Sequence, residues 1–362
     1  MTPVRLTSVA RILGMAAPVA RGVAALGVDV QLRALPRAGW GSGDYVIARV
    51  RPGSPLVFPV ELPCGRACDL GHGELVLGAL GVRAATLEAV GSWRAVGDDG
   101  GLHLLTGGGL LGRATSKSDL IPPLVELEYL GHVAAEGRLL RMRECAPRAP
   151  DQDFRLPTIV VVGSSMSAGK TTTARALVRA LVGMGQRVVA AKVTGAARYR
   201  DALAMADAGA VAAYDFVDVG LPSTVCDRGL YARALRDLLG WMAAAEADVA
   251  VVEAGASPLE PYNGDTALGA LAPFTCGVVL CASEPYAVVG IQQAFGVRPD
   301  LVAGRVAATD ASLDLVERLT GQRPVDARAR AAAPRLEAML DRCLRRAAAR
   351  GLVRDPAVPL AS

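Results

Sequence analysis

Apolar runs alternate with helical stretches from residue 158 onward, and this alternation constrains the fold more than any other feature of the chain. Runs such as TIVVVG (158–163) and ADVAVVEAG (247–255) are rich in valine and are separated by stretches whose apolar residues recur at helical spacing. Buried strands that alternate with helices are typical of a parallel sheet with helices on both faces. We therefore predict an α/β domain over residues 151–362.

The same patterns place the remaining elements of this domain. Further strands are expected over residues 186–195, 210–220, 276–283 and 301–309. Helices are expected over residues 170–185, 228–246, 264–272, 287–295, 311–320 and 327–350. The segment that holds Arg198 and Arg200 is expected to be a loop.

The N-terminal part of the chain has a different character. Short β-rich runs between glycines fill residues 40–145, and turn signals recur at short spacing. This pattern indicates a small β-barrel or sandwich. One or two helices, broken at Pro18, are expected within residues 5–35, and the proline-rich segment 146–157 is expected to be a linker. We therefore predict a smaller, barrel-like β-rich domain over residues 1–150, whose role the sequence does not indicate.

Composition excludes several classes of protein. The 362 residues are 52% hydrophobic and 20% charged, as in a packed globular protein. The net charge of +4 is too small and too dispersed to indicate a nucleic acid or a membrane as partner, and no apolar run is long enough for a spanning helix. The N-terminus lacks a signal-peptide pattern, and the seven scattered cysteines indicate reduced thiols. We expect a soluble, cytoplasmic protein.

Residues 159–173 (IVVVGSSMSAGKTTT) connect a strand to a helix through a loop of small residues that ends in Gly-Lys-Thr. Main-chain N–H groups in such a loop, together with the helix dipole, bind phosphate oxygens. Lys170 is expected to contact the β- and γ-phosphates, and Thr171 to ligate Mg²⁺. The alternative is a tight turn that binds nothing. The predicted nucleotide-binding residues are Gly163, Ser164, Ser165, Met166, Ser167, Ala168, Gly169, Lys170, Thr171 and Thr172.

Lysine is scarce in this chain, which draws attention to its positions. Only Lys117, Lys170 and Lys192 are lysines among 39 basic residues. Where arginine is so strongly preferred, a lysine indicates a position that needs a compact cation on a slim side chain. Lys192 lies near the end of the strand expected over residues 186–195, so we expect it to neutralise charge on a transferred phosphoryl group. The alternative is a surface lysine.

Acidic residues end two strands at the sheet edge where the loop is expected. Glu253 ends the run ADVAVVE, and Asp215 lies in the run AAYDFVDVG together with Asp218. A carboxylate at the carboxyl end of such a strand can hold Mg²⁺ directly or through water. We predict Thr171, Asp215 and Glu253 as metal-binding residues. Lys170, Lys192 and Glu253 are the predicted catalytic residues. The alternative for Glu253 is a helix N-cap acid or a solvated loop charge. For Asp215 and Asp218 the alternative is a turn carboxylate, which is the preferred interpretation of Asp218.

The stretch GSSMSAGKTTT (163–173) resembles the G-x5-G-K-T loop of dethiobiotin synthetase and related P-loop proteins. AAKVTG and VVEAGASPLEP are similar to two further segments of that family, and EAGAS followed by EPYNG resembles P-loop proteins described as D-glutamate N-acetyltransferases. The resemblance covers residues 158–326 and implies a P-loop NTPase sheet, binding of ATP and Mg²⁺, and a homodimer. Lys192 lacks the proline that follows it in the family, and Ala254 replaces a glycine. Nucleotide handling therefore transfers better than substrate identity.

Other residues allow two interpretations each. Arg198 and Arg200 either clamp an anionic substrate or form a solvated basic loop. Asn263, the only asparagine, either contacts the substrate or belongs to a tight turn. SKSD (116–119) looks like a guanine-reading motif, but it precedes the phosphate-binding loop, so ATP is favoured over GTP.

Cysteine and histidine positions add little to the predicted chemistry. Cys64, Cys68 and His72 could hold a zinc ion, but their spacing and the lack of a fourth ligand favour ordinary thiols. The three histidines, His72, His103 and His132, all precede the α/β domain. Histidine acid–base chemistry within that domain is therefore not expected.

These features together predict an ATP- and Mg²⁺-dependent synthetase or ligase that acts on a small carboxylate-bearing metabolite. The γ-phosphoryl group of ATP would pass to the carboxylate, and an amine would then attack the mixed anhydride. Two alternatives stay open: a nucleotide-driven switch or cofactor-insertion factor that responds to a partner protein, and an acyltransferase that acts on an amino acid. A small carboxylate or amino acid is the expected partner.

Overall fold

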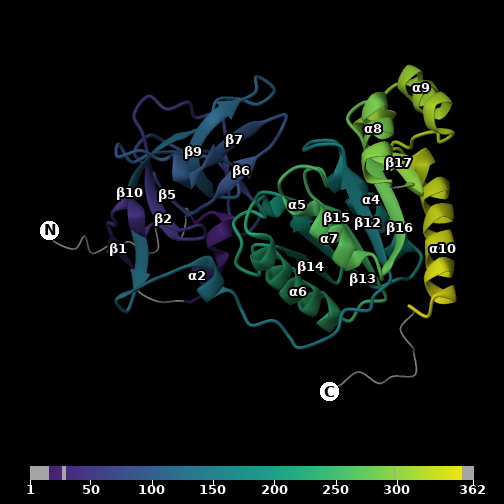
Figure 1. The fold of residues 1–362 in the computed structure, drawn as a ribbon, viewed down its shortest axis with the longest axis horizontal. Helices are drawn as coiled ribbons and strands as arrows, with labels where there is room; N and C mark the ends of the chain where they lie inside the picture. Colours follow the sequence, from purple (N-terminus) through teal and green to yellow (C-terminus); the bar gives the residue numbers. More distant parts are fainter. Residues whose placement is uncertain (1–15, 27–29, 297, 353–362) are drawn as a thin grey trace.

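The computed structural model describes residues 16–26, 30–296 and 298–352, and it contains two main sheets of different kinds (Figure 1). A mixed sheet forms what we call the β-rich part, residues 16–145. A parallel sheet forms the α/β part, residues 158–352. The two parts lie side by side, and residues 146–157 connect them without a helix or strand. The prediction of a mixed α/β chain with a parallel sheet after a β-rich segment is confirmed.

Six parallel strands form the sheet of the α/β part, in the order β14-β13-β15-β12-β16-β17. Their bounds are β12 (Thr158–Gly163), β13 (Val188–Thr194), β14 (Ala212–Asp215), β15 (Val249–Ala254), β16 (Thr275–Cys281) and β17 (Leu301–Ala303). All six expected strands are present, and β14 and β17 are shorter than predicted by six residues or more. β14 ends at Asp215, after which the chain turns, and β17 ends at Ala303, where Gly304 has a positive φ and a 3-10 turn follows.

The path of the chain through the sheet reverses at its centre. It moves to one side from β12 to β13 and β14, and to the other side from β15 to β16 and β17. Ligands of open α/β sheets bind beyond the carboxyl ends of the strands at such a point. Glu253 of β15 is the register partner of both Lys192 in β13 and Val161 in β12. The carboxyl ends of β12, β13 and β15 therefore meet at one edge.

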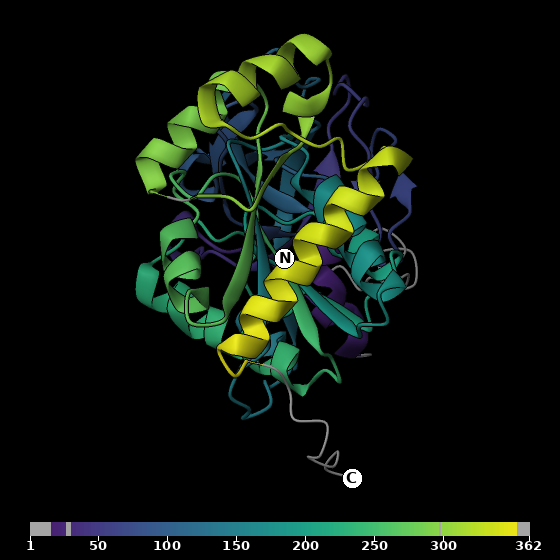
Figure 2. The same cartoon turned by 90° about the vertical axis from the view of Figure 1, so that its right-hand side faces the viewer.

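Helices cover both faces of this sheet. Their bounds are α4 (Lys170–Gly183), α5 (Tyr199–Ala206), α6 (Arg228–Ala244), α7 (Gly264–Leu271), α8 (Pro285–Phe295), α9 (Asp310–Thr320) and α10 (Ala333–Ala349). One face packs Ile159 and Val161 against α4 and α10, and the other packs Val160 and Val162 against α6, α7 and α8. Figure 2 shows α10 crossing the first face diagonally. No helix within the described ranges is both long and apolar enough to cross a membrane.

Two helices differ from the sequence prediction. α5 occupies residues that were expected to form a loop around Arg198 and Arg200. α10 begins only at Ala333, after the 3-10 turn η5 (Arg330–Ala332), rather than at residue 327. A proline in the first turn of α10 fits this later start, because proline is tolerated only at the beginning of a helix.

The β-rich part is built around a closed set of strands. Its main sheet consists of β1 (Gln31–Arg33), β2 (Tyr45–Val50), β5 (Leu75–Leu80), β6 (Val82–Ala84), β7 (Ala89–Ser92), β8 (Gly101–Leu104), β9 (Leu110–Lys117), β10 (Glu126–Ala135) and β11 (Arg138–Leu139). Pairings run from β2 to β5, β9, β8, β10 and back to β2, so these five strands close on themselves as in a small barrel. Only the β5–β9 pair is parallel among these five.

Short elements surround this barrel. They are η1 (Pro18–Ala20), α2 (Arg21–Leu26), η2 (Arg37–Gly39), η3 (Trp93–Ala95), α3 (Met142–Cys145) and a separate strand pair, β3 (Val60–Glu61) with β4 (Ala67–Cys68). The helix expected after Pro18 is present as η1 and α2. Its expected counterpart within residues 5–15 lies outside the described residues.

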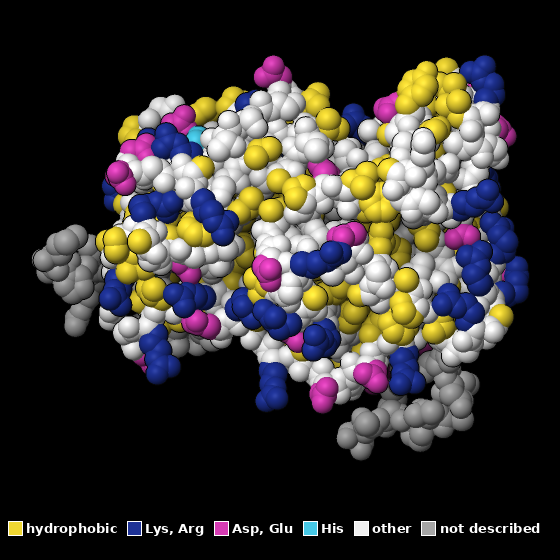
Figure 3. Space-filling model, viewed as in Figure 1, with side chains coloured by type: hydrophobic (Ala, Val, Ile, Leu, Met, Phe, Trp, Pro, Cys, Tyr) yellow, Lys and Arg dark blue, Asp and Glu magenta, His cyan; other side chains and the backbone are white. Residues whose placement is uncertain are grey.

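Charged side chains are interspersed over the face shown in Figure 3. A run of basic side chains at the right edge of that view follows α10. Arg346 on this helix donates to the carbonyl oxygen of Cys276, and Arg350, just after it, donates to those of Thr275 and Pro273. These arginines attach α10 to the amino end of β16.

Specific contacts join the two parts. The Tyr262 hydroxyl accepts a hydrogen bond from the Ala84 amide at 2.8 Å, and Glu260 accepts from the amide and hydroxyl of Thr86. One hydrophobic core runs from the barrel into the helix-covered sheet. A Cβ at Gly108 would lie 2.4 Å from the Ala197 carbonyl oxygen, so the backbones approach closely here. The hairpin of β6 and β7 is thereby fixed against residues 257–262.

We predict that Tyr262→Phe lowers the free energy of unfolding by about 1–2 kcal/mol, because the Ala84 amide loses its acceptor at this interface. Tyr262 is fully buried, whereas Tyr286 is 68% exposed and provides a matched control. Urea titration should show a lower midpoint for the Tyr262 variant and no change for Tyr286→Phe. Equal midpoints for both variants would contradict the assigned role.

Candidate functional site

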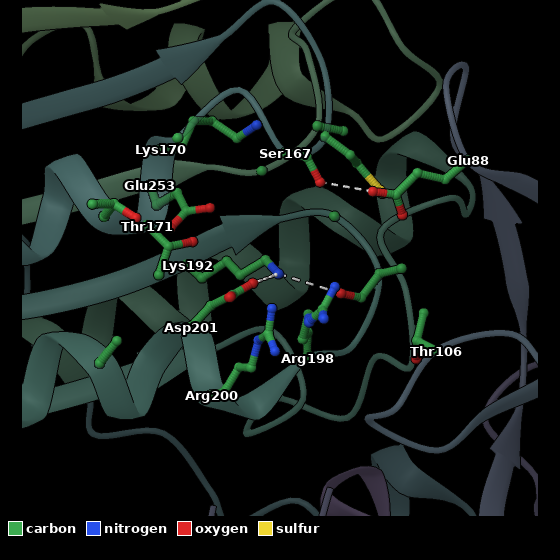
Figure 4. Close-up of a pocket in the computed structure, with 18 of the residues that line it drawn as sticks. Glu88, Thr106, Ser167, Lys170, Thr171, Lys192, Arg198, Arg200, Asp201 and Glu253 are labelled. Atoms are coloured by element: carbon green, nitrogen blue, oxygen red, sulfur yellow. Dashed lines mark hydrogen bonds and ion pairs between the residues drawn. The ribbon is translucent and has the colours of Figure 1, made fainter. Parts of the chain in front are cut away.

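A cavity of about 550 Å³ lies where the edge formed by β12, β13 and β15 meets the β-rich part (Figure 4). Both parts of the chain contribute to its walls. The lining residues are Arg83, Glu88, Thr106, Met166, Ser167, Gly169, Lys170, Thr171, Thr172, Lys192, Gly195, Ala196, Arg198, Arg200, Asp201, Ala204, Glu253, Gly255 and Ala256. A cavity therefore lies beyond the carboxyl ends of the strands, at the point where the path of the chain reverses. This is where the sequence patterns predict a ligand site.

Hydrogen bonds anchor the loop between β12 and α4 to the neighbouring strand ends. Ser164 donates its amide to the Cys281 carbonyl oxygen, and its hydroxyl accepts from the Ser283 amide. The Ala168 carbonyl oxygen accepts from the Arg305 amide at 3.1 Å. The loop is thus held at both ends by the residues that follow β16 and β17.

The backbone of this loop adopts a conformation that directs α4 at the cavity. Ser167 and Gly169 have φ values of 61° and 100°. A left-handed serine is uncommon and persists where the surroundings hold it. α4 begins at Lys170 without a side-chain cap, so the first N–H groups of the helix have no partner within it. The cavity reaches this helix start at Lys170, Thr171 and Thr172.

The predicted nucleotide-binding residues divide into two groups. Met166, Ser167, Gly169, Lys170, Thr171 and Thr172 line the cavity. Gly163, Ser164, Ser165 and Ala168 do not line it and support the loop from behind. Gly163 leaves room for Lys170, because a Cβ at residue 163 would lie 2.7 Å from Cδ of that lysine.

Lys170 is buried, with a side chain that bends back over the loop. Its Nζ donates to the Ser165 carbonyl oxygen at 2.6 Å. Burial lowers the pKa of Lys170, and the nearby carboxylate of Glu253 opposes this effect only in part. An anion bound beside Lys170 would stabilise its charged form.

Lys192 lies across the cavity from the loop, in an ion pair that the sequence did not indicate. Its Nζ donates to Oδ2 of Asp201 at 2.5 Å (Figure 4). Burial alone would lower the pKa of Lys192, but attraction to Asp201 and Glu253 outweighs burial and raises it. The same attraction lowers the pKa of Asp201 against the effect of its own burial. The pair is therefore charged at neutral pH.

Glu253 is 2% exposed, and its Oε2 atom has no hydrogen-bond partner within the described structure. Burial and repulsion from Asp201 raise the pKa of Glu253, while Lys192, Lys170 and the Thr171 hydroxyl oppose this. The unpartnered oxygen of Glu253 and the neighbouring hydroxyl of Thr171 are both hard oxygen ligands, which Mg²⁺ prefers. Glu253 and Thr171 would hold the ion together with water and ligand oxygens.

In the part of the chain that the structure describes, no three His, Cys, Asp or Glu residues gather into a metal-binding cluster. A magnesium site of the kind predicted does not need one, because Mg²⁺ retains waters and binds through one or two carboxylates plus phosphates. The donors that line the cavity thus suit a metal that arrives with a polyphosphate.

Asp215 does not belong to the lining of the cavity. Its Oδ1 accepts from Arg21 of α2 at 2.5 Å and from the Val217 amide. Asp218 shares the same guanidinium, and burial together with repulsion from Asp215 raises its pKa. The second acid beside Lys192 and Glu253 is therefore Asp201, and the metal role predicted for Asp215 gains no support from its placement. The prediction rested on the strand end and on the resemblance of its D-F-V context to the related families, neither of which indicates that Arg21 reaches Asp215 from the β-rich part.

Arg198 and Arg200 lie at the start of α5 rather than in a loop, and both line the cavity. No side chain within α5 caps this helix. Instead Glu61 of β3 accepts from the amides of Tyr199 and Arg200 at 2.8 and 3.3 Å. The helix start that carries two arginines and Asp201 is therefore positioned by a residue of the β-rich part.

Three cavity residues from the β-rich part were not predicted. They are Arg83 of β6, Glu88 in the turn before β7, and Thr106 after β8. The Ser167 hydroxyl donates to Oε1 of Glu88 at 2.8 Å, and Arg83 pairs with the other oxygen of that carboxylate. No local motif marks these residues. Their position depends entirely on how the two parts of the chain meet.

The remaining candidates have structural roles or lie apart. The Asn263 side chain donates to the carbonyl oxygens of Thr224 and Cys226, and its φ of 60° fits the turn interpretation. Cys64 and Cys68 lie at the β3–β4 hairpin and His72 contacts a main-chain oxygen, with no metal cluster among the described residues.

Comparison with protein-family models and with curated proteins gave no match to this chain. The interpretation of the site therefore depends on its residues and geometry.

We predict that Asp201→Asn destabilises the fold by about 3–5 kcal/mol at neutral pH, because it leaves the ammonium of Lys192 buried without its partner. The pKa of Asp201 is lowered in the folded state, so its contribution is present above its unfolded pKa of about 3.9. That contribution disappears as the pH falls through the lower, folded value.

Urea titrations of the wild type and of Asp201→Asn at pH 3 to 7 check this prediction. The difference in unfolding free energy between the two proteins should shrink below about pH 4. The exposed acid on α6, Asp237, gives a control variant, Asp237→Asn, with no such difference. A difference that is equal at pH 3 and pH 7 would contradict the assigned ion pair.

Proposed function

We propose that the chain is an ATP- and Mg²⁺-dependent synthetase or ligase whose α/β part is a P-loop nucleotide-binding domain. One observation carries the proposal: a single cavity brings the loop before α4, Lys170, Lys192 and Glu253 together at the carboxyl edge of a parallel sheet. Strand, Gly-Lys-Thr and helix occur there in the order that phosphate binding requires. The proposed relation to the dethiobiotin synthetase-like P-loop proteins is based on the same motifs.

The loop and the start of α4 would bind the polyphosphate. Uncapped N–H groups at Lys170, Thr171 and Thr172 and the positive end of the helix dipole attract anions. Lys170 donates to the Ser165 carbonyl oxygen, and it can exchange that acceptor for a phosphate oxygen with little movement. Its lowered pKa would return toward the ordinary value beside such an anion.

When bound, Mg²⁺ neutralises phosphate charge and aligns the β- and γ-phosphate oxygens. Thr171 would orient a hydroxyl toward the ion. Glu253 would supply the carboxylate, through the Oε2 atom that has no other partner among the described residues. The burial of Glu253 favours such pairing, because an unpaired carboxylate in this environment is costly.

A small carboxylate acceptor would lie between the loop and α5. Its oxygen would attack the γ-phosphorus while the bond to the β–γ bridging oxygen breaks, so that ADP leaves and a mixed anhydride forms. An amine would then attack the acyl carbon and release phosphate. Lys192, Arg198 and Arg200 provide positive charge on this side of the cavity. Positioning and electrostatics supply most of such catalysis, so no histidine base is required.

Release of ADP from Mg-ATP tests this proposal against the alternatives. We expect small carboxylic or amino acids to stimulate ADP release by the purified chain. Stimulation by a protein alone would favour the switch, and acetyl-CoA consumption without ADP release would favour the acyltransferase. Either result would overturn the synthetase assignment.

We predict that Lys170→Ala weakens ATP binding by about 10–150-fold or more, because it removes a charge-assisted contact to phosphate. The exposed Lys117 lies on β9, away from the cavity, so Lys117→Ala is the matched control and should bind ATP normally. Isothermal titration with Mg-ATP, with thermal melting to verify folding, gives the measurement. Unchanged ATP affinity in the Lys170 variant would refute the loop assignment.

We also predict that Glu253→Gln raises the Mg²⁺ concentration needed for half-maximal ATP binding by about 10–100-fold, the range seen when groups that orient a metal are removed. ATP affinity without Mg²⁺ should change little. Glu246→Gln, at an exposed site in the loop before the same strand, serves as the control. Equal Mg²⁺ dependence in the Glu253 variant and the wild type would exclude the metal role.

A further inference from the structure

The β6–β7 hairpin of the β-rich part places an ion pair directly on the loop that precedes α4. Arg83 on β6 pairs with Glu88 in the turn before β7, and both residues line the cavity. Glu88 also accepts a hydrogen bond from the Ser167 hydroxyl at 2.8 Å (Figure 4). These residues are separated by about eighty positions from the loop in sequence and have no part in the function proposed above.

Arg83 has unusual surroundings for an arginine. It is 3% exposed, and its Nη1 donates to the Leu105 carbonyl oxygen at 2.6 Å. Its Nη2 contacts Glu88 and lies 3.8 Å from Sδ of Met166, a residue of the loop. Its Nε has no hydrogen-bond partner within the described structure. A guanidinium at the wall of a cavity, with one donor unused and another on a carboxylate, can exchange that carboxylate for an anion in the cavity.

Glu88, in contrast to Arg83, would repel an anion bound in the cavity. Its side chain is 11% exposed, and its carboxylate lies within hydrogen-bond distance of the loop residue Ser167. A polyphosphate on the loop would bring several negative charges close to this carboxylate. Like charges in a partly buried site repel strongly, so Glu88 opposes the ligand that the loop is built to bind, unless it moves away.

The hairpin that carries this pair is held in place by hydrogen bonds to the α/β part. The Ala84 amide is held by Tyr262, and Thr86 is held by Glu260. Both anchors follow β15 in the chain, the strand that carries Glu253. The backbone that carries Arg83 is therefore held beside the loop, and only the side chain has to move to reach a bound anion.

We propose that Arg83 is a phosphate-binding residue contributed by the β-rich part, which contacts the terminal phosphate of the bound nucleotide, and that Glu88 is its counter-ion when the site is empty. On binding, Arg83 leaves Glu88 for the phosphate, and Glu88 moves away from Ser167. This proposal rests on the proposed function, because it requires a nucleoside triphosphate on the loop. It assigns to the β-rich part a direct role in telling a triphosphate from a diphosphate.

Affinities for Mg-ATP and Mg-ADP, measured by isothermal titration on the full chain, test the proposal. We expect Arg83→Gln to weaken Mg-ATP binding by about tenfold or more and Mg-ADP binding by less than about threefold. We expect Glu88→Gln to strengthen Mg-ATP binding several-fold, because the repulsion is removed and Arg83 is released. Arg113→Gln, a surface arginine of β9 that pairs with Asp99, should leave both affinities unchanged.

The two variants are expected to change ATP affinity in opposite directions, and this distinguishes phosphate binding from a structural role of the ion pair. If the pair only supports the loop, Glu88→Gln weakens ATP binding, and the proposal is overturned. An unchanged ratio of ATP to ADP affinity in Arg83→Gln also overturns it. If Arg83→Gln fails to fold in a melting experiment, the sign found for Glu88→Gln decides. A wild-type chain that binds neither nucleotide would overturn the proposed function itself. If the wild type binds both nucleotides, the results for the two variants overturn or support only the role of Arg83.

Discussion

The parallel register of β12, β13 and β15 is the constraint on which the site depends. This register pairs Glu253 of β15 with Lys192 of β13 and with Val161 of β12. Gly163, where the phosphate-binding loop begins, lies two residues after Val161. A shift of one residue in either ladder would turn a charged side chain to the opposite face of the sheet. Because both faces are covered by helices, that charge would then be buried without a partner. The same strand register is therefore required both to bury the apolar side chains of the sheet and to pair its charged side chains.

Charges at this edge are stable only as a group. Lys170, Lys192, Asp201 and Glu253 are buried close together, and each alters the pKa of at least one other. The Lys192–Asp201 pair is satisfied internally, whereas among the described residues Oε2 of Glu253 has no hydrogen-bond partner and Lys170 donates to a carbonyl oxygen rather than to an acid. The unsatisfied members face the loop. A cation and a polyphosphate are the ligands that would complete the group, which is the physical basis of the proposed function.

The β-rich part converts an open sheet edge into a partly enclosed cavity. Glu61 caps α5, the β6–β7 hairpin reaches the loop, and Thr106 closes the far wall. The Thr106 hydroxyl and Nε of Arg83 are buried without hydrogen-bond partners among the described residues, and Nε of Arg198 has only an ion-pair contact with Glu61 at 3.6 Å. Together with Oε2 of Glu253, these atoms give the cavity several buried polar groups that a ligand could satisfy. Enclosure also lowers the local dielectric, which strengthens every charge interaction inside the cavity.

Sequence alone determined the features that depend on local pattern. The alternation of strands and helices, the loop before α4, and the positions of Lys192 and Glu253 near strand ends follow from residues that are neighbours in the chain. The tertiary structure decided the rest. α5 was missed because its cap, Glu61, lies 138 positions away, so no start signal precedes it. Asp201, rather than Asp215, lines the cavity with Lys192 and Glu253, whereas Asp215 pairs with Arg21, 194 positions away in the chain. Arg83, Glu88 and Thr106 carry no motif, since only the meeting of the two parts brings them to the cavity, and contacts over such separations leave no periodic trace in sequence.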